Sequence, residues 1–330
     1  MNHRATIRLL PATGRLHLND GPIDLIIGAD GSPTEIRTAY HAASRRFVTI
    51  LDELCTELPI LRSSIRAIAG SSALPGPTGS IAQCMAAVVS PYRHRCFITP
   101  MAAVAGAVAE AVLAVMTESS QLDRAYVNNG GDIAFHLSPG QRYKIGMVER
   151  PENPSLFGSI EIPFETPVRG IATSGWRGRS FSLGIADAVT VLAETAAQAD
   201  AAATVIANAV DLPNHPAITR VPAREISPDS DLLDLPVTRD VGPLSAPEIA
   251  QALSSGAAVA QQLRAQPLIH AAALCLQRHA LLVPVCGGGL LRPSVVPSPR
   301  CATNERYFVT ASQPVSLLSR CPTEDRPCPK

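Results

Sequence analysis

The chain has 330 residues, of which 46% are hydrophobic, 17% are charged and 4% are aromatic. Its 28 Lys and Arg residues balance 28 Asp and Glu residues, so the formal net charge is zero. A net charge of zero gives no long-range attraction to nucleic acid or to an anionic membrane, and we expect neither as a partner. The length and hydrophobic content predict a globular protein with a large core.

The hydrophobic segments predict neither export nor a membrane span. The first ten residues, MNHRATIRLL, contain no apolar stretch of signal-peptide length. The most apolar segment, residues 101–116, is shorter than a membrane span and contains Glu110, which indicates a core helix. We therefore expect a cytoplasmic protein. The eight cysteines include no C-x-x-C pair, so neither a zinc site nor a disulfide framework is predicted.

The first part of the chain predicts strands followed by helices. Short strands are expected over residues 5–30, where turns containing Pro, Gly and Asn separate them. A helix is expected from Thr34 to just before Pro59, because apolar residues recur at helical spacing. Residues 70–80, rich in Gly, Pro and Ser, are expected to form a loop before the apolar helix over residues 101–116.

The rest of the folded region predicts many strands and two further helices. The helices are expected over residues 195–209 and 245–265, and the second begins with a capping box formed by Ser245 and Glu248. Residues 211–243, in which proline recurs, are expected to be rich in loops. Strands are expected at residues 124–128, 133–137, 143–148, 159–162, 170–172, 188–193, 269–275 and 280–285. This alternation predicts an α+β fold with a mixed β-sheet core flanked by helices.

The composition changes near Leu291, after which proline recurs without apolar periodicity. We therefore predict a single domain over residues 1–291 and a disordered tail over residues 292–330. Within the domain, residues 95–210 contain the motifs described below, and residues 244–291 form a C-terminal helical part.

Three polar segments carry the chemistry of a candidate site. The first, Asn128-Asn129-Gly130-Gly131-Asp132, follows a predicted strand, and its glycines allow backbone N–H groups to approach a ligand. The second is Thr173-Ser174-Gly175, which offers two hydroxyl groups. The third is the pair Asp200 and Thr204, whose spacing places a carboxylate and a hydroxyl on one helix face. A hairpin turn, a strand end and an exposed polar pair are the ordinary alternatives.

In this order, the segments resemble the G-G turn, the T-S-G segment and the A-D-x-x-A-T helix of the ApbE-like superfamily. Here the last motif is Ala199-Asp200-Ala201-Ala202-Ala203-Thr204. Characterised members of this superfamily are magnesium-dependent flavin transferases, which split FAD and pass its FMN half to a Ser or Thr of a target protein. Three further segments are similar to a shorter, functionally uncharacterised branch, namely residues 15–30, 98–111 and 183–193.

The resemblance implies a site for magnesium and a flavin nucleotide. By the match to the family's motif, Asp200 and Thr204 correspond to the magnesium ligands, and the two polar turns to the walls that bind FAD or a related phosphorylated cofactor. A hard divalent cation held by oxygen ligands stabilises charge on phosphate oxygens, as cleavage of a pyrophosphate requires.

One departure from the family's pattern concerns the reaction. Flavin transferases carry an H-x-x-D-P-x-T-G stretch between the T-S-G segment and the A-D-x-x-A-T helix, whereas the interval from Trp176 to Ala199 contains no histidine. His136 and Asp187 are the remaining candidates for a catalytic base. A structural role explains His136 better, and a turn-forming role explains Asp187 equally well.

These observations predict a magnesium-dependent protein that binds FAD or a related phosphorylated cofactor and that cleaves or transfers its FMN part. Two alternatives stay open. The first is a non-catalytic binding protein or chaperone for such a cofactor, which the missing histidine favours, and the second is a structural or assembly protein. The sequence does not specify a protein acceptor or the oligomeric state, and a homodimer is one of the states it allows.

Overall fold

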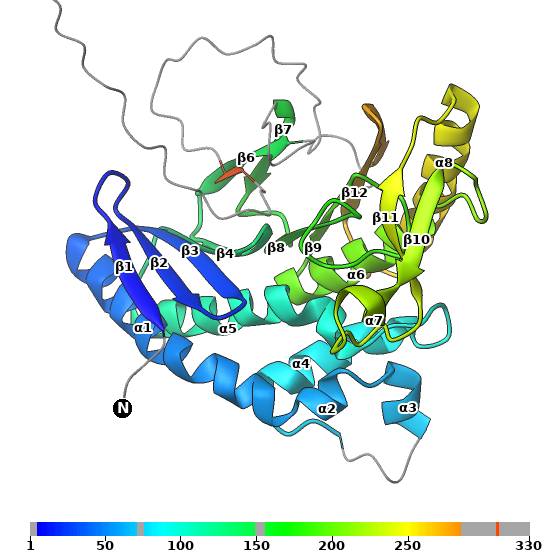
Figure 1. Ribbon diagram of the computed structural model, residues 1–330. Coiled ribbons are helices and arrows are strands. Elements are labelled where there is room, and N and C mark those ends of the chain that lie inside the picture. The colour runs from blue at the N-terminus through cyan, green and yellow to red at the C-terminus, as the bar shows by residue number, and fades with distance from the viewer. Residues whose placement is uncertain (1–4, 71–75, 149–155, 285–307, 310–330) are drawn as a thin grey trace, which may run out of the picture.

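The computed structural model describes residues 5–70, 76–148, 156–284 and 308–309. Its centre is a nine-stranded sheet with the strand order β1-β2-β3-β4-β5-β8-β9-β12-β13, in which every neighbouring pair is antiparallel (Figure 1). These strands are β1 (Thr6–Leu10), β2 (Arg15–Asp20), β3 (Ile23–Asp30), β4 (Arg124–Asn129), β5 (Asp132–Leu137), β8 (Gly170–Ser174), β9 (Ala188–Ala193), β12 (Ala271–Leu276) and β13 (His279–Val283). The α+β fold with helices flanking a sheet is therefore confirmed.

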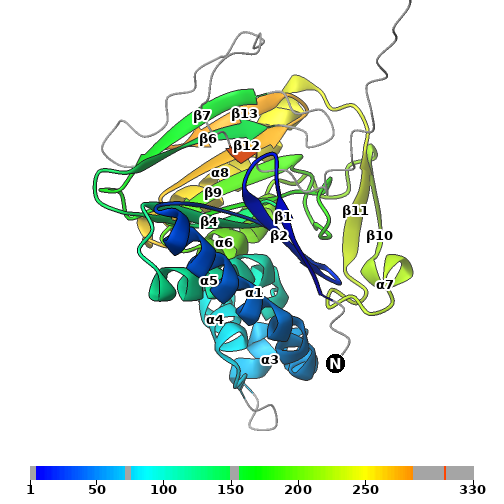
Figure 2. The ribbon, with the colours of Figure 1, turned by 90° about the vertical axis from the view of Figure 1, so that its left-hand side faces the viewer.

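Helices cover one face of this sheet, and a small second sheet covers part of the other face (Figure 2). The helices are α1 (Pro33–Thr56), α2 (Leu58–Leu61), α3 (Ile65–Gly70), α4 (Ser80–Val89), η1 (Ser90–Tyr92), η2 (Pro100–Ala103), α5 (Val104–Ser119), α6 (Ala196–Ala209), α7 (Ala223–Ile226) and α8 (Ala246–Ala265). The second sheet contains β6 (Arg142–Val148), β7 (Leu156–Pro163) and β14 (Phe308–Val309). A further hairpin pairs β10 (Ile218–Pro222) with β11 (Pro236–Val241).

Alternation along the strands produces two separate apolar cores. Leu16 and Leu18 of β2 and Leu25 of β3 are buried on the helix-facing side. Tyr126 of β4 and Phe135 of β5 are buried on the opposite side, together with residues of β6 and β7. Because successive side chains of a strand point to opposite faces, the same strands supply both cores.

Helices α5 and α6 cross at very close range. A Cβ atom at Gly106 of α5 would lie 2.3 Å from the carbonyl oxygen of Ala196, at the first turn of α6. Each helix also caps the other. The Glu110 carboxylate of α5 accepts a hydrogen bond from the Ala197 N–H (2.6 Å), and the Asp200 carboxylate of α6 accepts one from the Gly106 N–H (3.0 Å). Each carboxylate therefore satisfies a backbone donor that lacks a partner within its own helix.

Most predicted elements lie where the sequence places them. Residues 211–243, expected to be rich in loops, contain β10, α7 and β11. Residues 70–80 are expected to form a loop. Of these, Gly70 ends α3, Ser80 begins α4, and the described residues 76–79 directly precede α4. The predicted tail lies outside the described residues, except for Phe308–Val309, which pairs in parallel with β6.

One helix among the described residues, Pro100–Ser119, is long and apolar enough by length and composition to cross a membrane. It comprises η2 and α5, and its inner part is buried at Val108, Val112 and Met116. In this fold it packs against α1, α6, β4 and β5 (Figure 1). Its hydropathy is therefore explained by its place in the core.

Replacing Gly106 by Ala is expected to lower the free energy of unfolding by about 2 kcal/mol. The added Cβ must displace the backbone of α6, and this overpacking outweighs the ~1 kcal/mol of helix propensity that Ala gains over Gly. Urea denaturation followed by circular dichroism measures the change. Gly76→Ala is the control, because a Cβ at that position would meet no atom within 4 Å. Equal unfolding midpoints for the two variants would contradict this account of the crossing.

Candidate functional site

A pocket of about 610 Å³ opens at the end of the sheet where the β2–β3 and β4–β5 turns meet helices α1, α2 and α5. Its polar lining includes Asn129, Gly130, Asp132, Arg62, Arg179 and Ser180. Its apolar wall includes Leu51, Leu54, Leu58, Leu61, Met101, Val104 and Val108. The volume and the mixture of an apolar wall with a few polar groups are typical of small-molecule sites.

The β4–β5 turn brings the first predicted segment to this pocket. Gly130 and Gly131 have φ values of +66° and +115°, in the region that favours glycine, so the hairpin geometry itself requires this pair. The Asn128 carboxamide oxygen accepts a hydrogen bond from the Gly131 N–H (2.8 Å) and fixes the turn. The Asn129 carboxamide donates to the Ala105 carbonyl (3.2 Å), which joins the turn to the start of α5.

Asp132 begins β5 and links the first predicted segment to the second. Its carboxylate accepts a hydrogen bond from the backbone N–H of Thr173 (3.1 Å) on β8. Burial raises the pKa of Asp132 to about 7, and the hydrogen bond from Thr173 opposes this shift. Burial therefore favours the protonated form of this carboxyl.

Asp200 lies next to Asp132 and links the third segment to the same place. Burial, followed by the charge of Asp132, raises the pKa of Asp200 well above its ordinary value, and the N–H groups at the start of α5 oppose the shift. Within the described residues, no Lys, Arg or His side chain bonds to either carboxylate. Two neighbouring carboxylates without a cation repel each other, and each therefore disfavours ionisation of the other.

The remaining residues of the predicted segments lie near this pair but outside the pocket lining. Thr204 is half-buried one turn after Asp200 on α6. The Thr173 hydroxyl bonds to the Thr190 hydroxyl (2.9 Å), while Ser174 lies at the end of β8. Gly175 packs against the next segment, since its Cβ would lie 2.4 Å from the Asp187 carbonyl oxygen. Close backbone packing therefore explains why a glycine occupies position 175.

The two candidate bases lie apart from the pocket lining. His136 is on β5, four residues beyond Asp132 and therefore about 13 Å further along the strand. Burial lowers its pKa below the ordinary value, and its nearest side-chain partner is the Ser138 hydroxyl (3.5 Å). It is thus a neutral imidazole at neutral pH.

The Asp187 carboxylate is buried and is already bonded to three donors. It accepts hydrogen bonds from the Trp176 indole (3.2 Å), the Arg177 guanidinium (2.7 Å) and the Gln277 backbone N–H (2.6 Å). These bonds tie the segment after β8 to the β12–β13 turn. The Asp187 carboxylate therefore has a structural role, because it holds these two segments together. Its role as a catalytic base stays a prediction.

The pair of carboxylates could hold a cation with a hydroxyl and water. No group of three or more His, Cys, Asp or Glu side chains is placed to hold a metal ion within the described part of the chain. Magnesium does not require such a cage, because it commonly binds one or two carboxylates and keeps several water ligands. Asp132 and Asp200 carry carboxylate oxygens of the kind that magnesium binds.

Several lining residues were not predicted from the sequence. Arg62 and Arg179 are exposed at the pocket, and Arg179 donates a hydrogen bond to the Pro22 carbonyl (2.8 Å). The apolar wall comes from the last turns of α1 and from α2. The helical spacing of Leu51, Leu54 and Leu58 could have indicated that wall, but no local signal connects Arg179 to residues more than 100 positions away.

The family model described as AbpE bacteria matches residues 7–287 of the chain. A UPF0280 protein of Methanopyrus kandleri is 38% identical over 128 residues, which are 39% of this chain and 48% of that protein. A UPF0280 protein of Methanothrix thermoacetophila is 39% identical over 114 residues, which are 34% of this chain and 46% of that protein. The chain thus spans about half the length of the curated relatives it matches.

Two solved structures also share features of this architecture. The apo form of the flavinyl transferase ApbE from Pseudomonas stutzeri is 12% identical, with a TM-score of 0.41 over 87% of this chain and 97% of that chain. The flavin transferase ApbE from Vibrio cholerae is 12% identical, with a TM-score of 0.35 over 86% of this chain and 97% of that chain.

The raised pKa of Asp132 predicts that metal-free protein loses stability as the pH rises. Between about pH 4 and pH 7 the folded state binds more protons at Asp132 than the unfolded state, so the free energy of unfolding falls with pH. We expect Asp132→Asn to remove on the order of 4 kcal/mol of this fall. Urea denaturation in EDTA at a series of pH values measures the slope.

The control for this experiment is Asp240→Asn, which changes an exposed aspartate on β11. It should keep the slope of the wild-type protein. An unchanged slope in Asp132→Asn would mean that the Asp132 carboxyl is not held in the environment described above.

Proposed function

This chain belongs to the AbpE bacteria family, and we propose that it binds FAD or a related phosphorylated cofactor together with magnesium and that it cleaves or transfers the FMN part. The observation that carries the proposal is the pair of carboxylates Asp132 and Asp200, which have no cationic partner among the described residues. The pair adjoins a pocket large enough for part of such a ligand. The resemblance of the three polar segments to flavin transferases favours a flavin nucleotide.

The residues at the carboxylate pair fit a magnesium ion. Asp132 and Asp200 would supply the charged oxygen ligands, and Thr204 a neutral one. The raised pKa values support this assignment, because a bound cation would offset the burial of both carboxylates and the repulsion that Asp132 exerts on Asp200. When bound, magnesium would neutralise charge on phosphate oxygens.

The pocket divides into parts that suit the two halves of such a cofactor. The apolar wall from α1, α2 and α5 suits a flat ring system, because an apolar wall removes its surface from water. Arg62 and Arg179 place two guanidinium groups at the same pocket, where they would bind phosphate oxygens. Gly130 leaves the backbone of the β4–β5 turn open to the ligand, because it carries no side chain.

A non-catalytic cofactor-binding protein or chaperone is the second candidate function. The observation that favours it is the position of the two candidate bases. His136 lies about 13 Å along β5 from Asp132, and the Asp187 carboxylate is bonded to three donors. Such a protein would keep the pocket and the cation site and would lack turnover.

Incubation of the purified protein with FAD and magnesium separates these functions. Release of FMN and AMP, or transfer of FMN to a Ser or Thr of an added protein, supports the enzyme. Magnesium-dependent binding of FAD in calorimetry without turnover supports the binding protein. The absence of both would leave the third function, a structural or assembly protein in the cytoplasm.

Asp200→Asn is expected to weaken magnesium-dependent FAD binding at least ~10-fold, because it removes a charged ligand of a hard cation. Thr204→Val should have a smaller effect, since a neutral hydroxyl contributes less than a carboxylate. Calorimetric titration of FAD with and without magnesium measures both changes. Asn can still accept the hydrogen bond from the Gly106 N–H, so the contact between α5 and α6 is expected to survive.

The matched control is Glu194→Gln, which removes an exposed carboxylate just before α6. Its FAD affinity should equal that of the wild-type protein. Equal affinities for wild type and Asp200→Asn in the presence of magnesium would instead assign Asp200 to capping α5 alone.

A further inference from the structure

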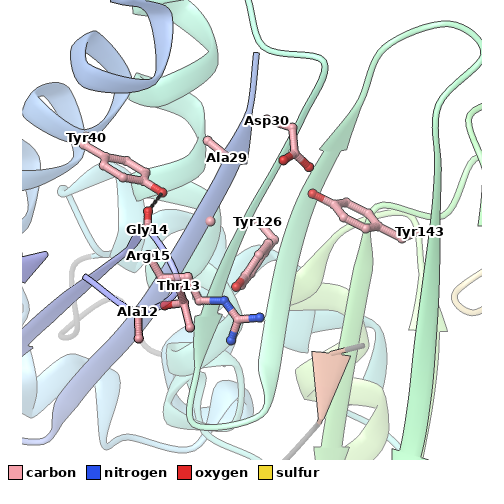
Figure 3. A pocket seen from close by; sticks show the side chains of 10 residues that line it. Ala12, Thr13, Gly14, Arg15, Ala29, Asp30, Tyr40, Tyr126 and Tyr143 are labelled. Atoms are coloured by element: carbon pink, nitrogen blue, oxygen red, sulfur yellow. Dashed lines mark hydrogen bonds between the residues drawn. The ribbon is translucent and has the colours of Figure 1, made fainter. Parts of the chain in front are cut away.

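A second hollow, of about 280 Å³, lies on the other face of the sheet and at the other end of its strands. Figure 3 shows the side chains of Arg15, Tyr126 and Tyr143 around it, beside the turn that joins β1 to β2. The Tyr40 hydroxyl of α1 donates a hydrogen bond to the Gly14 carbonyl (2.9 Å) and holds this turn in place (Figure 3).

The hollow exists because a glycine of β3 lies between two large side chains of the neighbouring strands β2 and β4. Gly28 of β3 pairs with Tyr126 of β4. Leu16 of β2 pairs with Ile27 of β3, so the preceding residue of β2, Arg15, lies opposite Gly28. A Cβ at Gly28 would lie 2.3 Å from the Tyr126 ring. The glycine therefore lets the tyrosine ring lie over β3, within reach of Arg15.

The walls of the hollow are aromatic and meet at a right angle. Tyr126 and Tyr143 are each 5% exposed, and their ring planes make an angle of 87° with centroids 6.4 Å apart. Rings in this edge-to-face contact form a corner, and a third ring can pack against that corner. A flat ligand therefore fits the hollow better than a branched aliphatic one.

The hollow contains one guanidinium group that has no acidic partner among the described residues. The Arg15 guanidinium lies over the Tyr126 ring, 6.0 Å from its centroid, and no acidic side chain among the described residues pairs with it. Asp30, which also lines the hollow, is paired with Arg124 (2.8 Å). Arg15 can therefore bind an anionic group of a ligand.

We propose that this hollow is a second ligand site, separate from the carboxylate pair, that binds a small planar carboxylate. The ring of the ligand packs against Tyr126 and Tyr143, and its carboxylate pairs with the Arg15 guanidinium. The volume suits a ligand with one aromatic or heteroaromatic ring. The site shares no lining residue with the pocket at Asp132, so the two sites can be occupied and tested independently.

A fluorine-19 NMR titration of the full chain with 4-fluorobenzoate tests the proposal. We expect saturable binding with a dissociation constant below ~1 mM. The neutral analogue 4-fluorobenzamide should bind about 10-fold more weakly, since it has the same ring and shape but no charge.

Two variants locate the site. Arg15→Gln should weaken 4-fluorobenzoate binding by about 10-fold or more, and Arg8→Gln, which changes an exposed arginine on the neighbouring strand β1, should leave it unchanged. Asp200→Asn should also leave it unchanged, so failure here and failure of the flavin site are distinguishable. The proposal is overturned if 4-fluorobenzoate shows no saturation up to ~10 mM, if the benzamide binds equally well, or if Arg15→Gln binds like wild type.

Discussion

The mutual capping of α5 and α6 is the contact on which the candidate site depends. Glu110 and Asp200 each accept a hydrogen bond from the first turn of the other helix, and Gly106 permits the close approach that both bonds require. This arrangement fixes Asp200 beside Asp132 and also places Ala105 where Asn129 can bond to it. The positions of the turn, the carboxylate pair and the start of α5 are therefore set by one crossing of two helices.

Asp200 has two roles in this arrangement, and they favour opposite protonation states of its carboxyl group. As a cap it benefits from N–H donors and from the positive end of the α5 dipole, which favour its charged form. As a neighbour of Asp132 inside the protein it is less stable when charged. Strain of this kind is common at functional sites, where an arrangement that is unfavourable for the empty protein becomes favourable when a ligand binds.

Local signals predicted most elements and the residues of the three polar segments, because turns, caps and apolar periodicity depend on neighbours in sequence. Helical spacing predicted α1, and the glycine pair predicted the β4–β5 turn. The structure added contacts between residues distant in sequence, such as Glu110 with Ala197 and Arg179 with Pro22. The repeated prolines of residues 211–243 concealed β10 and β11, since proline is tolerated at the ends of strands: Pro222 ends β10 and Pro236 begins β11.

The pairing of β3 with β4 has a consequence for how the chain folds during its synthesis. Asp30 and Arg124, which bond to each other at this pairing, are 94 positions apart, and α1 to α5 all lie between them. The hairpins of β1, β2 and β3 can form as soon as they leave the ribosome, but the outer edge of β3 has no partner until β4 follows. At 5–20 residues per second this interval lasts roughly 5 to 20 s. During that time an unpaired strand edge is exposed, so this stage is where aggregation of the nascent chain, or protection by a chaperone, is most expected.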